Sequence, residues 1–119
     1  MSTRTERAII ELRYDTGVDL PERGIYRNQA IEPDTGSELL IDVHMLDEAD
    51  DTLPGNPYQR QVHLVGTAAG LEALGVYLIA LARLKTADPE PHGHFDDVRT
   101  SEGGTISLIP RRLPAIPEA

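Results

Sequence analysis

The sequence predicts an α+β fold, in which a mostly antiparallel sheet of about five strands carries one main helix packed across one face. Three observations lead to this prediction. One segment of the 119-residue chain, residues 66–85, repeats apolar residues with the period of a helix. Several short segments alternate apolar and polar residues, which is typical of half-buried strands. Aromatic residues make up only 4% of the chain, so the core between helix and sheet should be aliphatic.

The helix is expected within residues 66–85. Thr67 precedes a run of good helix formers and can cap the first turn, whereas Asp88 followed by Pro89 disfavours helix. At ~100° per residue, four leucines share one face, which predicts that this face packs on the sheet. They are Leu71, Leu74, Leu78 and Leu81. Val76 and Ile79 lie on the opposite face, where either a loop or terminus of the chain covers them or they are candidates for contact with a partner or with a second copy of the chain.

Five segments are expected to be strands because apolar and polar residues alternate in them between turn-forming residues. They are residues 6–14, 25–31, 37–46, 59–65 and 105–109, with a further short extended piece at 95–99. Their inward-facing side chains should lie under the helix leucines. These side chains are Ile10, Leu12, Ile41, Val43, Val62, Leu64, Ile106 and Leu108. Residues 1–119 are interpreted as a single domain with an extended tail at about 110–119, in which Arg111 and Arg112 are expected to be solvated.

The composition limits the classes of function. A formal net charge of −9 disfavours binding to nucleic acid and to anionic membranes, both of which attract Lys and Arg. The absence of cysteine removes disulfides and thiolate chemistry. No cofactor motif is visible, and no segment reaches the ~20 apolar residues that a membrane-spanning helix needs. The N-terminus lacks the apolar stretch of a secretory signal, so a cytoplasmic location is expected.

Acidic residues gather at the end of the expected strand 37–46. Asp42 lies in this strand, and an acidic run follows it: Asp47, Glu48, Asp50 and Asp51. Such a run is either a solvated loop or an electrostatic recognition element for a basic partner. These five carboxylates are therefore the candidate partner-binding residues.

A second cluster lies in residues 92–97. His92, His94, Asp96 and Asp97 could supply nitrogen and oxygen ligands to zinc or a similar ion. Their spacing matches no specific zinc motif, and a loop does not preorganise ligands. The expectation is therefore no bound metal, and a metal-binding protein or metal-dependent enzyme centred on this loop is the alternative interpretation.

His44 and His63 are expected to point outward from neighbouring strands. With Asp42 or Glu11 they could form a general acid/base pair. Polar side chains are expected on the outer face of a sheet in any case, and the serines do not lie in a nucleophile elbow. The sequence therefore favours a non-enzymatic protein.

Residues 62–112 combine a strand, a glycine- and leucine-rich helix, a His-x-His-x-Asp loop and a closing strand. This combination resembles a family of small bacterial immunity proteins of polymorphic toxin systems. The helix pattern is carried by Gly66, Gly70, Leu71, Leu74, Leu78, Leu81 and Ala82, and the loop pattern by His92, His94 and Asp96. Gly75 stands where the family pattern has Ala, and the N-terminal half of the chain lies outside the resemblance.

The resemblance implies a non-enzymatic protein that binds and neutralises a cognate secreted toxin, whose identity it does not specify. Together with the acidic run, it predicts that the carboxylates engage a basic cleft of the toxin, as a nuclease would present. A third interpretation is a subunit that docks a partner or a second copy through Val76 and Ile79.

Overall fold

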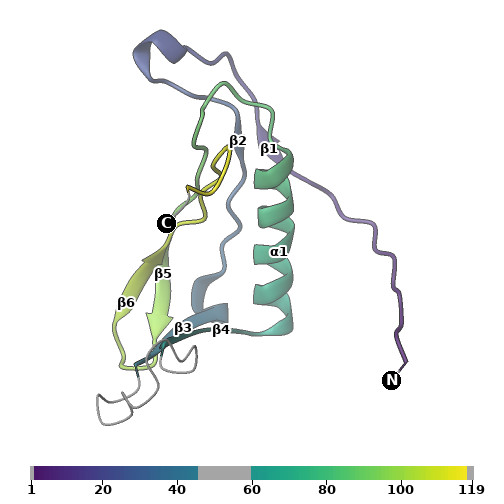
Figure 1. Ribbon diagram of the computed structural model, residues 1–119, viewed down its shortest axis with the longest axis vertical. Helices are drawn as coiled ribbons and strands as arrows, with labels where there is room; N and C mark the ends of the chain where they lie inside the picture. Colours follow the sequence, from purple (N-terminus) through teal and green to yellow (C-terminus); the bar gives the residue numbers. More distant parts are fainter. Residues whose placement is uncertain (1, 46–59, 118–119) are drawn as a thin grey trace.

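A computed structural model of the protein describes residues 2–45 and 60–117 (Figure 1). In chain order its elements are β1 (Tyr14–Asp15), η1 (Pro21–Arg23), β2 (Gln29–Ala30), η2 (Gly36–Glu38), β3 (Leu39–Met45), β4 (Arg60–Gly66), α1 (Ala68–Arg83), β5 (Phe95–Thr100) and β6 (Thr105–Leu108). One main helix thus accompanies two sheets in which most strand pairs are antiparallel. The predicted α+β class is confirmed.

The larger sheet has the strand order β4-β3-β5-β6. The β3–β4 and β5–β6 pairs are antiparallel, whereas β3 and β5 are parallel. A parallel pair requires a crossover connection, and here β4 and α1 provide it. β1 and β2 form a separate two-stranded ribbon near the C-terminal end of α1 (Figure 1).

Both ends of α1 are capped by side chains. The hydroxyl of Thr67 accepts a hydrogen bond from the amide of Gly70 at 3.0 Å, which confirms the predicted N-cap, and it also donates to the Glu38 carboxylate. At the other end, the guanidinium of Arg112 donates to backbone carbonyls of the last turn. The expectation that Arg112 is solvated is therefore wrong.

The core lies between one face of α1 and the buried residues of β2, β3 and β5. It consists of Ala30, Leu39, Ile41, Leu74, Tyr77, Ala80, Leu81, Phe95 and Val98. Tyr77 packs edge-on against Phe95, with ring centroids 5.1 Å apart. Leu74 and Leu81 are buried as predicted, but Leu71 and Leu78 are exposed. The buried face of α1 is thus rotated about the helix axis from the predicted one, so that it includes Tyr77 and Ala80. These side chains share the core with residues of β2 and β5.

The strand residues that the sequence places in the core are buried only where α1 covers the sheet. Ile41 is buried, and Leu12 and Leu108 pack partly buried against the core. Five of the other residues predicted to lie in the core are instead exposed: Ile10, Val43, Val62, Leu64 and Ile106. The core contacts of β3 are confined to Leu39 and Ile41, at its start, and the outer ends of β3 and β4 extend beyond it (Figure 1).

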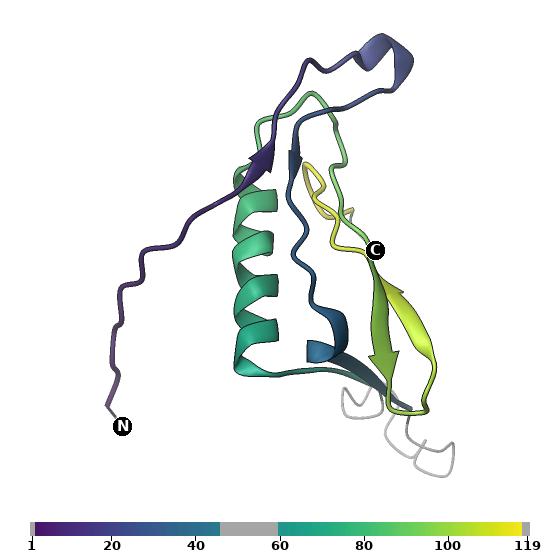
Figure 2. The same cartoon turned by 180° about the vertical axis from the view of Figure 1, so that it is seen from behind.

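The predicted strand at residues 6–14 is wrong except at its last residue. Only Tyr14–Asp15 pairs, with Gln29–Ala30 of β2, so the expected strand 25–31 is likewise reduced to two residues. Residues 2–9 run away from the rest of the molecule in both views (Figures 1 and 2), and Ile9 is fully exposed. Alternation favours a strand, but a strand forms only where a neighbour accepts its hydrogen bonds.

Candidate functional site

The outer end of the β3–β4 hairpin brings together several side chains that can take part in acid–base chemistry and ion pairing. Residues directly opposite each other share a face of the sheet, and the pairs alternate between faces. Asp42 is paired with His63, and His44 with Gln61, on one face. Val43 is paired with Val62 on the other face. The hairpin end therefore has one polar and one apolar side.

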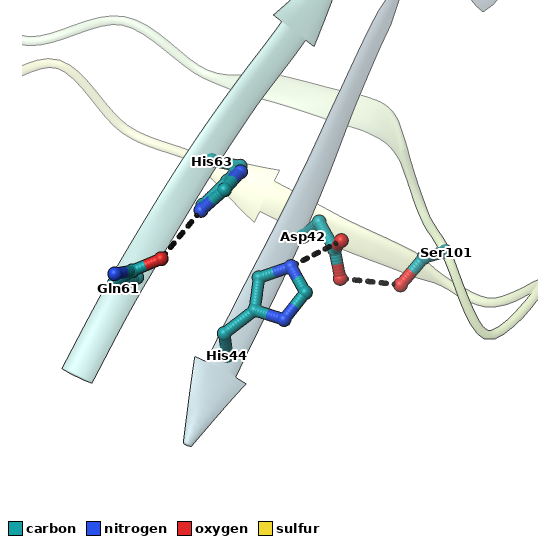
Figure 3. A network of polar contacts seen from close by, with 5 residues as sticks. All are labelled: Asp42, His44, Gln61, His63 and Ser101. Carbon is teal, nitrogen blue, oxygen red and sulfur yellow. Dashed lines mark hydrogen bonds and ion pairs between the residues drawn. The ribbon is translucent and has the colours of Figure 1, made fainter. Parts of the chain in front are cut away.

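The polar side is a connected network (Figure 3). The Asp42 carboxylate accepts a hydrogen bond from the Ser101 hydroxyl at 2.6 Å, and its other oxygen lies 2.7 Å from Nε2 of His44. The His44 and His63 rings are 4.6 Å apart between centroids, at an angle of 54°. Nε2 of His63 lies 2.9 Å from the Gln61 side-chain oxygen. Two strands, β3 and β4, and the turn after β5 contribute the residues of this network.

Asp42 is held as a carboxylate. The hydrogen bond from Ser101 lowers the pKa of Asp42 below its usual value of 3.8, and His44 and His63 act in the same direction. Partial desolvation acts in the opposite direction and does not reverse the shift. The negative charge at this position is therefore fixed in place by Ser101 and His44.

The network does not have the order of a nucleophilic triad. Ser101 donates to Asp42 rather than to an imidazole, so the carboxylate stands between the hydroxyl and His44. General-base activation of a hydroxyl needs the imidazole in direct contact with that hydroxyl. The predicted approach of His44 and His63 is correct, and Asp42 rather than Glu11 is the carboxylate that joins them. What the arrangement can do is present an oriented anion beside two imidazoles.

The opposite side of the hairpin end is apolar and open. Val43 is 54% exposed and Val62 is 70% exposed, and Leu64 is also exposed beside them. These residues continue the face that Leu39 and Ile41 bury against α1. Val43, Val62 and Leu64 thus form a small exposed aliphatic patch on the face of the sheet opposite to Asp42.

The other predicted partner-binding residues are distributed differently. Asp42 lies in the network, whereas Asp47, Glu48, Asp50 and Asp51 lie outside the residues that the structure describes. On the helix, Val76 is half-buried and lines a small cavity with residues of the N-terminal segment. Ile79 is exposed.

The loop and strand around residues 92–97 place three of the predicted metal ligands near one another, namely His92, His94 and Asp96. The rings of His92 and His94 lie 5.1 Å apart between centroids, and Nδ1 of His94 is 4.0 Å from an Asp96 oxygen. That same oxygen accepts a hydrogen bond from Ser107 at 2.9 Å. Across residues 2–45 and 60–117, no group of three or more His, Asp or Glu side chains is arranged to hold a metal ion.

Ser101 and Gln61 are the members of the network that the sequence did not indicate. Ser101 is 59 positions from Asp42 and reaches it because β5 lies parallel to β3. No local pattern encodes such a contact. Gln61 could have been found from the strand alternation, which places it on the same face as His63.

A scan against protein-family models and searches of curated proteins and of solved structures found no match to this chain. In the part of the chain that the structure describes, no helix combines the length and the apolar character needed to cross a membrane. The function is therefore inferred from the residues of the chain itself.

Proposed function

We propose that this protein is a non-enzymatic, protein-binding inhibitor of the immunity type, which neutralises a cognate bacterial toxin. The end of the β3–β4 hairpin is the binding element, and a toxin with a basic cleft, as a nuclease has, is the partner class. The proposal joins the family resemblance of residues 62–112 to the acidic character of the chain.

One observation carries this proposal. Asp42 lies at the hairpin end, where Ser101 and His44 contact its two carboxylate oxygens and its pKa is lowered. A negatively charged carboxylate is therefore held in one orientation there. The acidic run begins three residues after His44 in the sequence and contains Asp47, Glu48, Asp50 and Asp51. A preorganised carboxylate loses less conformational entropy on binding a cation than a free side chain does.

Charge and apolar contact have separate roles in such a complex. A net charge of −9 steers the inhibitor toward a basic cleft and raises the association rate. Val43 and Val62 are exposed on the other side of the hairpin and can be buried in the formed complex. Burial of apolar surface slows dissociation, because it is lost only when the partners separate.

The test is stopped-flow association with the toxin encoded beside the gene for this chain. Reversal of Asp42, Asp47, Glu48, Asp50 and Asp51 to Lys should slow association at low salt. The difference should disappear near 1 M salt, where the Debye length is about 3 Å. Glu22→Lys in η1 is the control, because η1 lies at the opposite end of the molecule from β3 and β4 (Figure 1).

Equal association rates for the hairpin variant and the Glu22→Lys control would contradict the assignment of this surface. The apolar contribution is tested separately with Val43→Ser and Val62→Ser, which should raise the dissociation rate and leave association nearly unchanged. Val18→Ser is the matched control, since Val18 is an exposed valine in the loop between β1 and η1.

A further inference from the structure

The outward face of α1 carries an uncovered apolar strip. Leu71, Leu78 and Ile79 are 44%, 44% and 42% exposed. Gly75 and Ala82 lie on the same face, because residues three, four and seven positions apart share one side of a helix. A side-chain carbon placed on Gly75 would have no neighbour within 4 Å, so this position is a shallow notch between the two leucines.

The chain exposes more surface than a compact monomer of its size. Its accessible surface is 9592 Å², whereas a monomeric protein of 13.1 kDa exposes about 6400 Å². This total is for the whole chain, and the extended N-terminal residues, of which Ile9 is fully exposed, contribute to it. A standard interface buries about 800 Å² on each partner.

The strip is complementary to itself. If two copies of α1 cross antiparallel around a two-fold axis that passes between residues 76 and 77, Leu71 of one copy faces Ala82 of the other. In the same arrangement Leu78 of one copy faces the notch at Gly75 of the other. Each large side chain therefore meets a small one, and the same pairing is repeated by symmetry.

The charges that border the strip fit the same arrangement. Glu72 lies in the first part of α1 and Arg83 ends it, on the outward side. They are about 16 Å apart along one helix, at 1.5 Å per residue, and so do not contact each other within one copy. An antiparallel pair of helices brings Glu72 of one copy near Arg83 of the other, twice.

We propose that the protein forms a two-fold symmetric homodimer through the outward face of α1, with the two helices antiparallel and Leu78 seated on Gly75 of the other copy. The interface leaves the outer end of the β3–β4 hairpin free, because that hairpin end lies beyond the N-terminal end of α1 (Figures 1 and 2). The dimer does not depend on the proposed inhibitor function.

Sedimentation velocity on the full chain tests the dimer over protein concentrations from ~1 to ~200 µM. The wild-type protein should reach twice the chain mass of 13.1 kDa. Gly75→Gln fills the notch with a good helix former and should keep the protein monomeric with unchanged helical circular dichroism. Ala69→Gln is the matched control; Ala69 is exposed on another side of α1, and this variant should dimerise like the wild type.

A charge swap tests the antiparallel geometry. Glu72→Arg and Arg83→Glu should each weaken dimerisation about 4- to 25-fold, because each change affects two symmetric, exposed ion pairs. The double variant should recover the wild-type association, which contact within one helix cannot produce. A wild-type protein that stays monomeric throughout overturns the proposal, and so does a dimer that Gly75→Gln leaves intact or that the charge swap does not restore.

Discussion

The Nη1 atom of Arg112 lies 2.9 Å from the carbonyl oxygen of Leu84 and donates a hydrogen bond to it. The same atom is 2.8 Å from the carbonyl oxygen of Leu81. These carbonyls belong to the C-terminal end of α1, where backbone oxygens lack the amide partner four residues on, and the Leu81 oxygen accepts only a long bond of 3.4 Å from the amide of Leu84. The guanidinium also stands at the negative end of the helix dipole. Arg112 therefore ties the segment after β6 to the end of α1.

Replacement of Arg112 should destabilise the protein. Arg112→Met keeps the apolar stem and removes the hydrogen bonds, so the free energy of unfolding should fall by about 1–3 kcal/mol. Urea denaturation measures this change. Arg111→Met is the control, because Arg111 is exposed, and its effect should stay within about 0.5 kcal/mol. Equal losses in both variants would show that Arg112 does not cap the helix in solution.

Leu74 and Leu78 should respond to truncation to different extents, although both belong to the leucine face that periodicity predicts to lie in the core. Leu74 is almost completely buried, so Leu74→Ala should lower the free energy of unfolding by about 2–5 kcal/mol. Leu78 faces outward, and Leu78→Ala should cost less than about 1 kcal/mol. Thermal melts at ~1 µM, where the proposed dimer should be largely dissociated, make the comparison. The reverse order of stability would place the wrong face of α1 in the core.

The two glycines inside α1 should also differ. A side-chain carbon on Gly70 would lie 2.7 Å from the backbone oxygen of Glu38, so Gly70→Ala should destabilise the protein by about 1–3 kcal/mol. Gly75 has open space around it, and Gly75→Ala should stabilise the isolated chain by about 0.5–1 kcal/mol. Guanidinium unfolding at low protein concentration tests both. A stabilising Gly70→Ala would mean that η2 does not pack against the helix.

Asp19 should make stability depend on pH in the acid range. It accepts hydrogen bonds from the amides of Ala87 and Arg27, at 3.1 and 2.7 Å, and these keep its pKa well below the ordinary value of 3.8. A lowered pKa means that the stabilisation is complete above pH 3.8 and is lost as the pH falls below it. Asp19→Asn should therefore lower the melting temperature at neutral pH.

The difference between the wild type and Asp19→Asn should shrink as the pH falls from about 4 to about 2. The control is Asp15→Asn, because Asp15 is exposed in β1. A difference that stays constant over this range would show that the carboxylate charge of Asp19 is not what holds the loop to the segment after α1.

Removal of the Ser101 hydroxyl should raise the pKa of Asp42 toward 3.8, because the hydrogen bond from Ser101 is the main cause of its lowering. The carboxyl carbon of Asp42, followed by NMR during an acid titration, reports this shift in Ser101→Ala. Ser107→Ala is the control, since Ser107 donates to Asp96 instead. An unchanged Asp42 titration in Ser101→Ala would remove Ser101 from the network.

The sequence by itself determined the features whose signals are local. Thr67 and the good helix formers after it placed the start of α1, because capping and helix propensity act within one or two turns. The alternation in β3 and β4 predicted these strands to within two residues, and it placed His44 and His63 on the outer face of the sheet. The gathering of acidic residues around the end of β3 is likewise a feature of the local sequence, and it indicates Asp42 as a candidate.

Only the tertiary structure decided which surfaces are covered. Leucines and other aliphatic residues occur on all sides of α1. Periodicity therefore could not distinguish the buried face, which includes Tyr77 and Ala80, from the exposed face, which includes Leu78. Residues 6–12 alternate as a strand does, yet none of them pairs with a strand in the part of the chain that the structure describes. The Ser101–Asp42 and Arg112–Leu84 contacts join positions 59 and 28 residues apart. Such contacts depend on how strands and helix are brought together in space, which no short stretch of sequence encodes.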